Sequence, residues 1–571
     1  MKRLESTMYV AFAIILLASC KASIRTIPVP LGGDNALNIP SKKVALTESK
    51  LRVWSHMDMQ TDSIPGMSIA KAYQFLQGKS GVAVIVAIAD SGIDVTHEDL
   101  KEVVWTNPKE IAENRIDDDK NGYTDDVHGW NFLGNKEGEI VNADQLEITR
   151  IVKIGMLKFS DKKVSEVSEA NKAAFEQYLD LKEKFETRNS AKKMEIANLK
   201  KTQKRLLQIE NNFREVKEFA GTSTLSAAIL KEVKPSDAKM GAKIADVIGM
   251  LDRGMTAEDL AEYKKGLTTY LDAQVAGKSY DLDFNARQTL GDDLYDIDDS
   301  FYGNNNVIGS KELESHGTHV AGIVAASRNN NTGVNGIANN VKIMAIRVVP
   351  GGDEHDKDVA LGIRYAVDNG AKIINTSFGK AYSPNRKWVY DAIKYAAKKD
   401  VLIVNAAGND GKDIDVTKTY PNDSEDMVNE ISDNVLTIGA MSLHYDEKLP
   451  ATFSNYGKMN VDVFAPGVDI YAPVPKDEYA SNSGTSMAAP SAAGVAALVR
   501  SYYPQLSASQ VKHILMNSGM KINFEVIKPG SQSRENPTGE KVPFSDLSVS
   551  GRVVNGYNAL IMADRIVNGK K

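Results

Sequence analysis

Three polar side chains, far apart in the sequence, are candidates for catalysis. Asp90 ends an apolar run, His316 opens a stretch of small residues, and Ser486 precedes a long apolar run. Taken singly, each is better explained as a helix cap, a core histidine or a turn residue. In the chain order Asp, His, Ser, however, they match one of the known orders of a catalytic triad. Such a triad attacks an acyl carbonyl through the serine hydroxyl, so acyl-group hydrolysis is the predicted chemistry.

A layered α/β domain would position these residues. The apolar run Val82–Ala89, rich in β-branched residues, is typical of a buried parallel strand, and it ends at Asp90. Further apolar strands alternate with helical patterns, which predicts a mostly parallel β-sheet with helices on both faces. Functional groups collect beyond the carboxyl ends of such strands. The expected strands are Val341–Val349, Ala371–Asn375, Val401–Asn405, Val435–Ala440 and Val461–Phe464, and the expected helices are Asp358–Asn369, Trp388–Lys399 and Ser507–Ser518.

Residues 138–300 have a different composition, with long, charged, glycine-poor segments. Apolar residues at three- and four-residue spacing cover 164–185 and 199–216, and Asn189 and Ser190 lie between them. This pattern predicts an antiparallel helical hairpin that turns at Asn189 and Ser190. A third helix is expected over Ser236–Leu251, and a fourth opens at Thr256 with an acid three positions later. The sequence therefore predicts a helical subdomain at 138–300, inserted between catalytic-domain segments 48–137 and 301–571.

The N-terminus indicates export. Basic residues precede the apolar stretch Met8–Leu17, which is too short for a stable membrane-spanning anchor. The tetrad Leu17-Ala18-Ser19-Cys20 resembles a bacterial lipobox, which implies a signal peptide over 1–19 and acylation of Cys20. The alternative is an ordinary signal peptide with a chance cysteine. We expect residues 20–47 to be a tether to the cell envelope, with the outer membrane favoured over the inner.

Composition limits the other partners. The 571 residues are 42% hydrophobic and 25% charged, the balance of a soluble globular protein. A net charge of −6 gives no reason to expect nucleic acid as a partner, and the single cysteine leaves no thiol for a disulfide once it is acylated. We therefore expect membrane contact through the lipid alone.

An acidic loop at 114–126 has the composition of a calcium site. Oxygen-bearing side chains alternate and are followed by Gly122, as in the first half of an EF-hand loop. His128 stands where the closing bidentate carboxylate would be, so a solvated acidic turn remains an alternative. The candidate ligands are Asp117, Asp119, Asn121 and Asp125.

Four short blocks together resemble the signature blocks of the subtilisin-like serine proteases. They are Asp90–Asp94, His316–Gly322, Asn405–Asn409 and Gly484–Pro490, in the family's order. The resemblance covers about 50–135 and 302–571 and leaves the helical subdomain outside it. The acidic loop and Gly129-Trp130-Asn131-Phe132 are most similar to cell-envelope subtilases of the Bacteroidetes type.

The resemblance implies a role for each matching residue. Ser486 would be the nucleophile, His316 the general base and Asp90 the group that orients His316, while the Asn409 amide and the Ser486 N–H would hold the oxyanion. The implied enzyme is a broad endopeptidase that acts on proteins or peptides and needs no cofactor for its chemistry. By the same resemblance, Ser377, Phe378 and Gly379 would pair with extended substrate, Ala407 and Gly408 would line the primary specificity pocket, and Asp99 and Asn331 would belong to a calcium site.

The sequence disfavours two other functions. A lipid-anchored binding or folding-factor protein on an inactive protease scaffold is disfavoured because all four catalytic residue types are present. An esterase is disfavoured because the chain has no Gly-x-Ser-x-Gly elbow. The 226 positions between Asp90 and His316 exceed the family's usual spacing, and the helical subdomain accounts for the excess. We expect this subdomain to lie near the cleft, where it would gate or extend substrate binding or assist folding.

Overall fold

A nine-stranded sheet forms the centre of the computed structural model, which describes residues 45–160 and 162–569. The strand order is β10-β13-β7-β6-β5-β4-β1-β3-β2, and every neighbouring pair is parallel except β10 and β13. The strands are β1 (Val84–Asp90), β2 (Gly129–Asn131), β3 (Val341–Arg347), β4 (Ile373–Thr376), β5 (Leu402–Ala406), β6 (Val435–Met441), β7 (Val463–Pro466), β10 (Met520–Lys521) and β13 (Arg552–Val553). The predicted, mostly parallel α/β sheet is confirmed.

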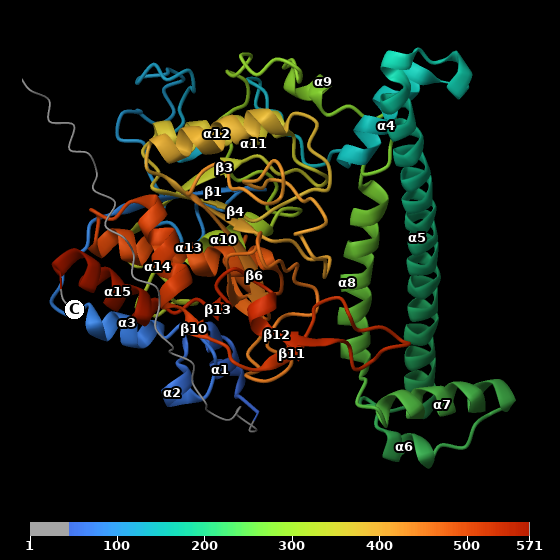
Figure 1. Ribbon diagram of the computed structural model, residues 1–571. Helices are drawn as coiled ribbons and strands as arrows, with labels where there is room; N and C mark the ends of the chain where they lie inside the picture. Colours follow the sequence, from blue (N-terminus) through green and yellow to red (C-terminus); the bar gives the residue numbers. More distant parts are fainter. Residues whose placement is uncertain (1–44, 161, 570–571) are drawn as a thin grey trace, which may run out of the picture.

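Helices cover both faces of this sheet (Figure 1). On one face lie α11 (Asp356–Asp368) and α12 (Arg386–Lys398); on the other lie α10 (His316–Ala325), α13 (Thr485–Tyr502) and α14 (Ala508–Ser518). Successive residues of β1 alternate between the two layers, because Val86 packs in one hydrophobic cluster and Ala87 in the other. Burial on both sides explains why β1 is a continuous apolar run.

Shorter elements complete the α/β core. The N-terminal helices α1 (Glu48–Leu51), α2 (Met59–Asp62) and α3 (Ile69–Phe75) precede β1, and α15 (Gly556–Asn568) packs against α3. Two antiparallel pairs stand apart from the main sheet: β8 (Ile470–Val474) with β9 (Glu478–Asn482), and β11 (Glu525–Ile527) with β12 (Lys541–Pro543).

The predicted subdomain is helical and lies beside the core (Figure 1). It comprises α4 (Glu147–Phe159), α5 (Lys172–Ala220), α6 (Ala227–Lys231), α7 (Ala238–Leu251), α8 (Ala257–Ala276) and α9 (Arg287–Leu290). Its apolar residues form clusters separate from those of the sheet. As predicted, Thr256 caps α8, and its hydroxyl accepts a hydrogen bond from the N–H of Asp259.

The predicted helical hairpin is wrong. Residues 172–220 form one continuous helix, α5, and the chain does not turn at Asn189 and Ser190. Neither residue forces a helix to end, as proline would. Because good helix formers lie on both sides, the helix continues through them. The two apolar stripes that suggested a hairpin pack on different partners, the first with Phe159 of α4 and the second with Ile244 of α7.

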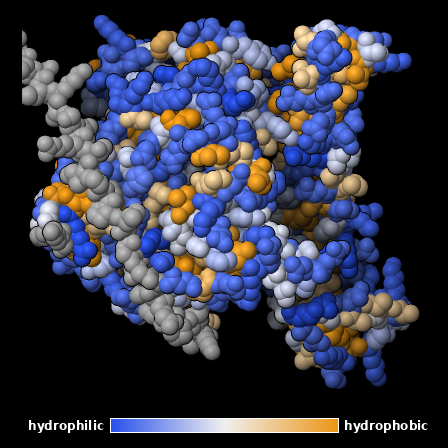
Figure 2. Space-filling view, viewed as in Figure 1, coloured by the Kyte–Doolittle hydropathy of each residue, from blue (hydrophilic) through white to orange (hydrophobic). Residues whose placement is uncertain are grey.

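The face of the molecule shown in Figure 2 is predominantly hydrophilic, with scattered apolar side chains. Within residues 45–160 and 162–569, no helix is both long enough and apolar enough to cross a membrane. The predicted signal peptide, the acylated Cys20 and nearly all of the tether lie outside the described residues.

Candidate active site

The carboxyl ends of three adjacent strands bring the predicted site residues together. Ala89 of β1 pairs with Thr376 of β4, and Thr376 pairs with Asn405 of β5. Asp90, Ser377 and the 406–409 segment therefore leave the sheet at one edge. This is the edge at which ligands bind in open α/β sheets.

Asp90 and His316 form a hydrogen bond at this edge. The distance from Asp90 Oδ1 to His316 Nδ1 is 2.8 Å, and Oδ1 also accepts the N–H of Ser91. Gly317 allows this contact, because a Cβ at that position would lie 2.3 Å from the carbonyl oxygen of Gly92 and 3.1 Å from Asp90 Cβ. A side chain there would push the start of α10 away from β1.

The carboxylate of Asp90 changes the protonation equilibrium of His316. Partial burial by itself lowers the pKa of the imidazole, but the charge and hydrogen bond of Asp90 outweigh it, so the pKa rises above its usual value of 6.5. Asp90 is 1% exposed, whereas the His316 side chain is 40% exposed. The imidazole can therefore meet both a buried carboxylate and a molecule in the cleft.

Ser486 lies in the first turn of α13 and is half-buried. Its hydroxyl donates to the carbonyl oxygen of Ser377 at 3.0 Å, and the Ser377 hydroxyl donates to the carbonyl of Ser486 at 2.9 Å. Within the described residues, no hydrogen bond joins His316 to Ser486. Because Ser486 lies at the N-terminus of a long helix, negative charge at or near its hydroxyl is favoured.

Thr485 orients the side chain of Asn409. The N–H and the hydroxyl of Thr485 both donate to Asn409 Oδ1, at 2.8 and 2.9 Å, and the same hydroxyl accepts the N–H of Gly408. With its oxygen held in this way, the amide of Asn409 keeps its NH₂ group for another acceptor. Nothing in the sequence indicates this role, because Asn409 lies 76 residues before Thr485 in the chain.

Two cavities meet along the segment that follows β4. One, of about 350 Å³, is lined by Ser486, Asn409, Ala407 and Gly408, and the other, of about 380 Å³, is lined by Asp90, His316 and Ser377. Phe378 and Gly379 line both. All five predicted substrate-binding residues therefore face the cleft that contains the predicted catalytic residues.

Arg347 at the end of β3 supports the segment that leads into α10. Its guanidinium contacts Glu314 through two nitrogens, at 2.5 and 3.0 Å, and both side chains are buried. Glu314 stands two residues before His316, so the pair fixes the start of the helix. Glu314 lies outside the strands and 33 residues before Arg347 in the chain, and this spacing gives no sign of the contact.

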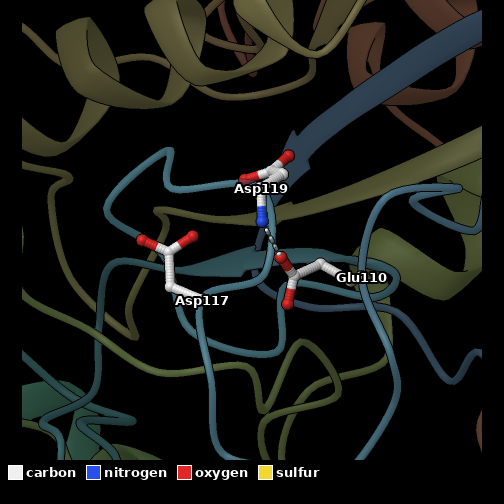
Figure 3. A group of neighbouring side chains, drawn as sticks. All are labelled: Glu110, Asp117 and Asp119. Carbon is white, nitrogen blue, oxygen red and sulfur yellow. Dashed lines mark hydrogen bonds between the residues drawn. The ribbon is translucent and has the colours of Figure 1, made fainter.

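The acidic loop gathers three carboxylates, but not the full predicted set (Figure 3). Oxygens of Glu110, Asp117 and Asp119 lie within 4.8 Å of one another. Glu110 was missed because it precedes the loop, and its Oε2 is buried without a hydrogen-bond partner in the part of the chain that the structure describes. Asn121 joins the loop through its N–H, which donates to both aspartates, whereas Asp125 instead accepts the N–H groups of residues 114 and 115.

Asp99 also differs from the predicted register. Its buried carboxylate accepts hydrogen bonds from the side chain of Asn330 at 2.7 Å and from the N–H of Val334 at 3.0 Å. The neighbouring Asn331, which the sequence suggested, is exposed. His319, three residues after His316, is buried, and its Nε2 forms a hydrogen bond with the carbonyl of Ala480 at 3.0 Å.

Comparison with known proteins identifies the family. A model of the Subtilase family matches residues 81–541, more than half of the chain. A thermophilic serine proteinase from Bacillus sp. (strain AK1) is 44% identical over 191 residues, 33% of this chain and 43% of the relative. A cell wall-associated protease from Bacillus subtilis (strain 168) is 34% identical over 248 residues, 43% of this chain and 26% of the relative. The chain thus spans less than half the length of either curated relative.

A solved protease structure from Pseudoalteromonas arctica PAMC 21717 is 28% identical in sequence. The match covers 46% of this chain and 74% of that one, with a TM-score of 0.34. Because the family model matches more than half of the chain, the chain belongs to the subtilase family.

Proposed function

We propose that this subtilase is a serine endopeptidase that hydrolyses proteins or peptides through Ser486, His316 and Asp90. The observation that carries the proposal is the 2.8 Å hydrogen bond between Asp90 Oδ1 and His316 Nδ1 at the mouth of the cleft that Ser486 also lines. That bond fixes the imidazole tautomer in which Nε2 accepts a proton.

In the proposed reaction, Ser486 Oγ leaves the Ser377 carbonyl and attacks the scissile carbonyl of the substrate. His316 takes the hydroxyl proton as the C–O bond forms, then returns it to the leaving amine as the C–N bond breaks. Water repeats the sequence and releases the acyl group from Ser486. Asp90 keeps its hydrogen bond to His316 Nδ1 and stabilises the imidazolium throughout.

The oxyanion would be held by Asn409 and by the backbone N–H of Ser486. Thr485 holds the oxygen of the Asn409 amide, so its NH₂ group is already oriented when negative charge develops. Extended substrate would add a strand along Ser377–Gly379, which pairs through backbone groups and is largely blind to sequence. The side chain on the attacked carbonyl would enter the cavity beside Ala407 and Gly408.

We also propose that the enzyme is a lipoprotein of the cell envelope, of the Bacteroidetes subtilase type, held by an acylated Cys20. A second part of the proposal is a structural Ca²⁺ in the acidic loop. Carboxylates are the ligands that Ca²⁺ prefers, and Glu110, Asp117 and Asp119 would supply three of them.

Hydrolysis of casein by the full-length protein tests the enzymatic part of this proposal. The wild type should release peptides, and Ser486→Ala should lower kcat by about 10⁶, the fall known for loss of this serine in subtilisin itself, a relative. Matching circular dichroism spectra would show that the variant is folded. Equal hydrolysis by both proteins, or none by the wild type, would refute the proposal.

A further inference from the structure

The helical insertion supplies part of the cavity wall next to Ser486. Leu146 and Ile148 at the start of α4, and Arg188 of α5, line the same cavity as Ser486 and Asn409. These three residues belong to the segment that lies outside the family blocks. The pocket beside the candidate nucleophile is therefore shared between the core and the insertion.

A buried ion network joins the insertion to the substrate-binding segment. Lys380 directly follows Gly379, and its Nζ lies 2.8 Å from Glu147 Oε2 and 2.8 Å from Asp356 Oδ1. Glu147 also binds Arg150 at 2.7 Å. The side chains of Lys380 and Glu147 are 2% and 9% exposed, so solvent screens their attraction little. The start of α4 is thereby fixed to the edge of the cleft.

Aromatic contacts between α4 and α5 hold α5 in place as well. Phe159 packs edge-on against Phe175, with ring centroids 5.2 Å apart. Farther along α5, Phe185 packs against Tyr280, with centroids 5.8 Å apart. Phe185 lies three residues before Arg188, so the backbone of Arg188 is held less than one turn from a buried contact.

Most charged groups that line this cavity already have partners. Asp353 accepts the N–H of Glu147 at 2.8 Å, and Lys380 is held in the network described above. Asp410 lies 3.7 Å from Lys412. Lys418 donates to the carbonyl of Glu425. Arg188 is exposed and has no hydrogen-bond or ion-pair partner among the residues that the structure describes.

We propose that Arg188 makes this pocket selective for an acidic side chain, glutamate above all, on the residue whose carbonyl Ser486 attacks. The inference rests on the proposed function. The guanidinium can bind a carboxylate through two hydrogen bonds, while Leu146, Ile148 and Ala407 pack against the methylene groups. The insertion thus adds charge selection to a cleft whose backbone pairing is unselective.

Fluorogenic peptides that differ only in the residue before the scissile bond test this proposal on the full-length protein. The peptide with glutamate should have a kcat/KM about tenfold higher than the peptide with glutamine, its neutral isostere. This factor corresponds to one charged hydrogen bond, reduced because Arg188 is exposed to solvent. In Arg188→Ala this ratio should fall to near one, and in Arg188→Glu a lysine peptide should be cleaved faster than a glutamate peptide. Added salt should lower the wild-type ratio.

The matched control is Arg205→Ala, which removes an exposed arginine from the same helix outside the cavity lining. It should keep the wild-type glutamate to glutamine ratio. The pocket proposal would be overturned by a wild-type glutamate to glutamine ratio of one or below, or by a ratio that is unchanged in Arg188→Ala. In either case, cleavage of the other peptides would still support the proposed function. If no peptide were cleaved and a serine-directed phosphonate did not label Ser486, both proposals would fail.

Discussion

The α/β core and the helical insertion position their functional groups in different ways. In the core, Asp90 ends β1, His316 opens α10, and Ser486 lies in the first turn of α13, so each group is placed by the end of an element. In the insertion, Arg188 lies well inside the 49-residue α5, away from either end, and is placed only by what that helix packs against. Residues at element ends can be recognised from local sequence, whereas residues placed by packing cannot.

The contact between the core and the insertion should give the largest effect when it is disrupted. Glu147→Gln keeps the shape of the side chain but leaves the buried cations of Lys380 and Arg150 without their shared carboxylate. We expect the free energy of unfolding to fall by about 3 kcal/mol or more, because Glu147 is the carboxylate that both cations share in a buried network, and Lys380 would keep only Asp356 and Arg150 only the more distant Asp144. Urea unfolding of the full-length protein measures this loss.

Asp180→Asn is the control for this substitution, because it removes a carboxylate from an exposed pair with Lys184 on α5. It should change the unfolding midpoint little. If Glu147→Gln unfolded at the same urea concentration as the wild type, the insertion would not be fixed to the core through Lys380.

Interrupting the continuous helix α5 should destabilise the protein less than removing Glu147. Ser190→Pro removes a backbone hydrogen bond and creates a clash inside a helix, which costs about 3 kcal/mol. Loss of helical circular dichroism and a lower free energy of unfolding are expected, with Ser190→Ala close to the wild type. Full tolerance of proline would favour the turn that the sequence pattern predicted.

The pH dependence of catalysis gives the smallest effect, and it tests the core alone. His316 must be neutral to accept the proton of Ser486, so kcat/KM should fall as the pH drops through the pKa of His316. Because Asp90 raises this pKa above 6.5, the acid limb should lie above that value in the wild type. In Asp90→Asn the limb should move to lower pH as the rate falls. An unmoved limb would mean that Asp90 does not control the protonation of His316.

The core could be predicted from the sequence because its signals are local. The apolar run of β1 reflects burial on both sides, and the residues that close it or open α10 and α13 are of recognisable types. Thr485 and Arg347 were not identified, because their partners Asn409 and Glu314 lie 76 and 33 residues away in the chain. Such contacts arise from sheet order and helix docking.

The insertion could be predicted only as helical. Three- and four-residue spacing shows that a helix has a buried stripe, but not which partner buries it. In α5 the two halves of the stripe face different partners, which is why one helix resembled two. Glu110, which precedes the acidic loop, was missed for a related reason: its carboxylate reaches Asp119 from outside the motif.

Labelling with a serine-directed phosphonate, located by mass spectrometry of the digested protein, tests the central claim most directly. We predict a single adduct on the peptide that contains Ser486, no adduct in Ser486→Ala, and slow labelling in His316→Ala, which lacks the general base. An adduct on another residue, or equal labelling of the wild type and Ser486→Ala, would contradict the assignment of Ser486 as the nucleophile.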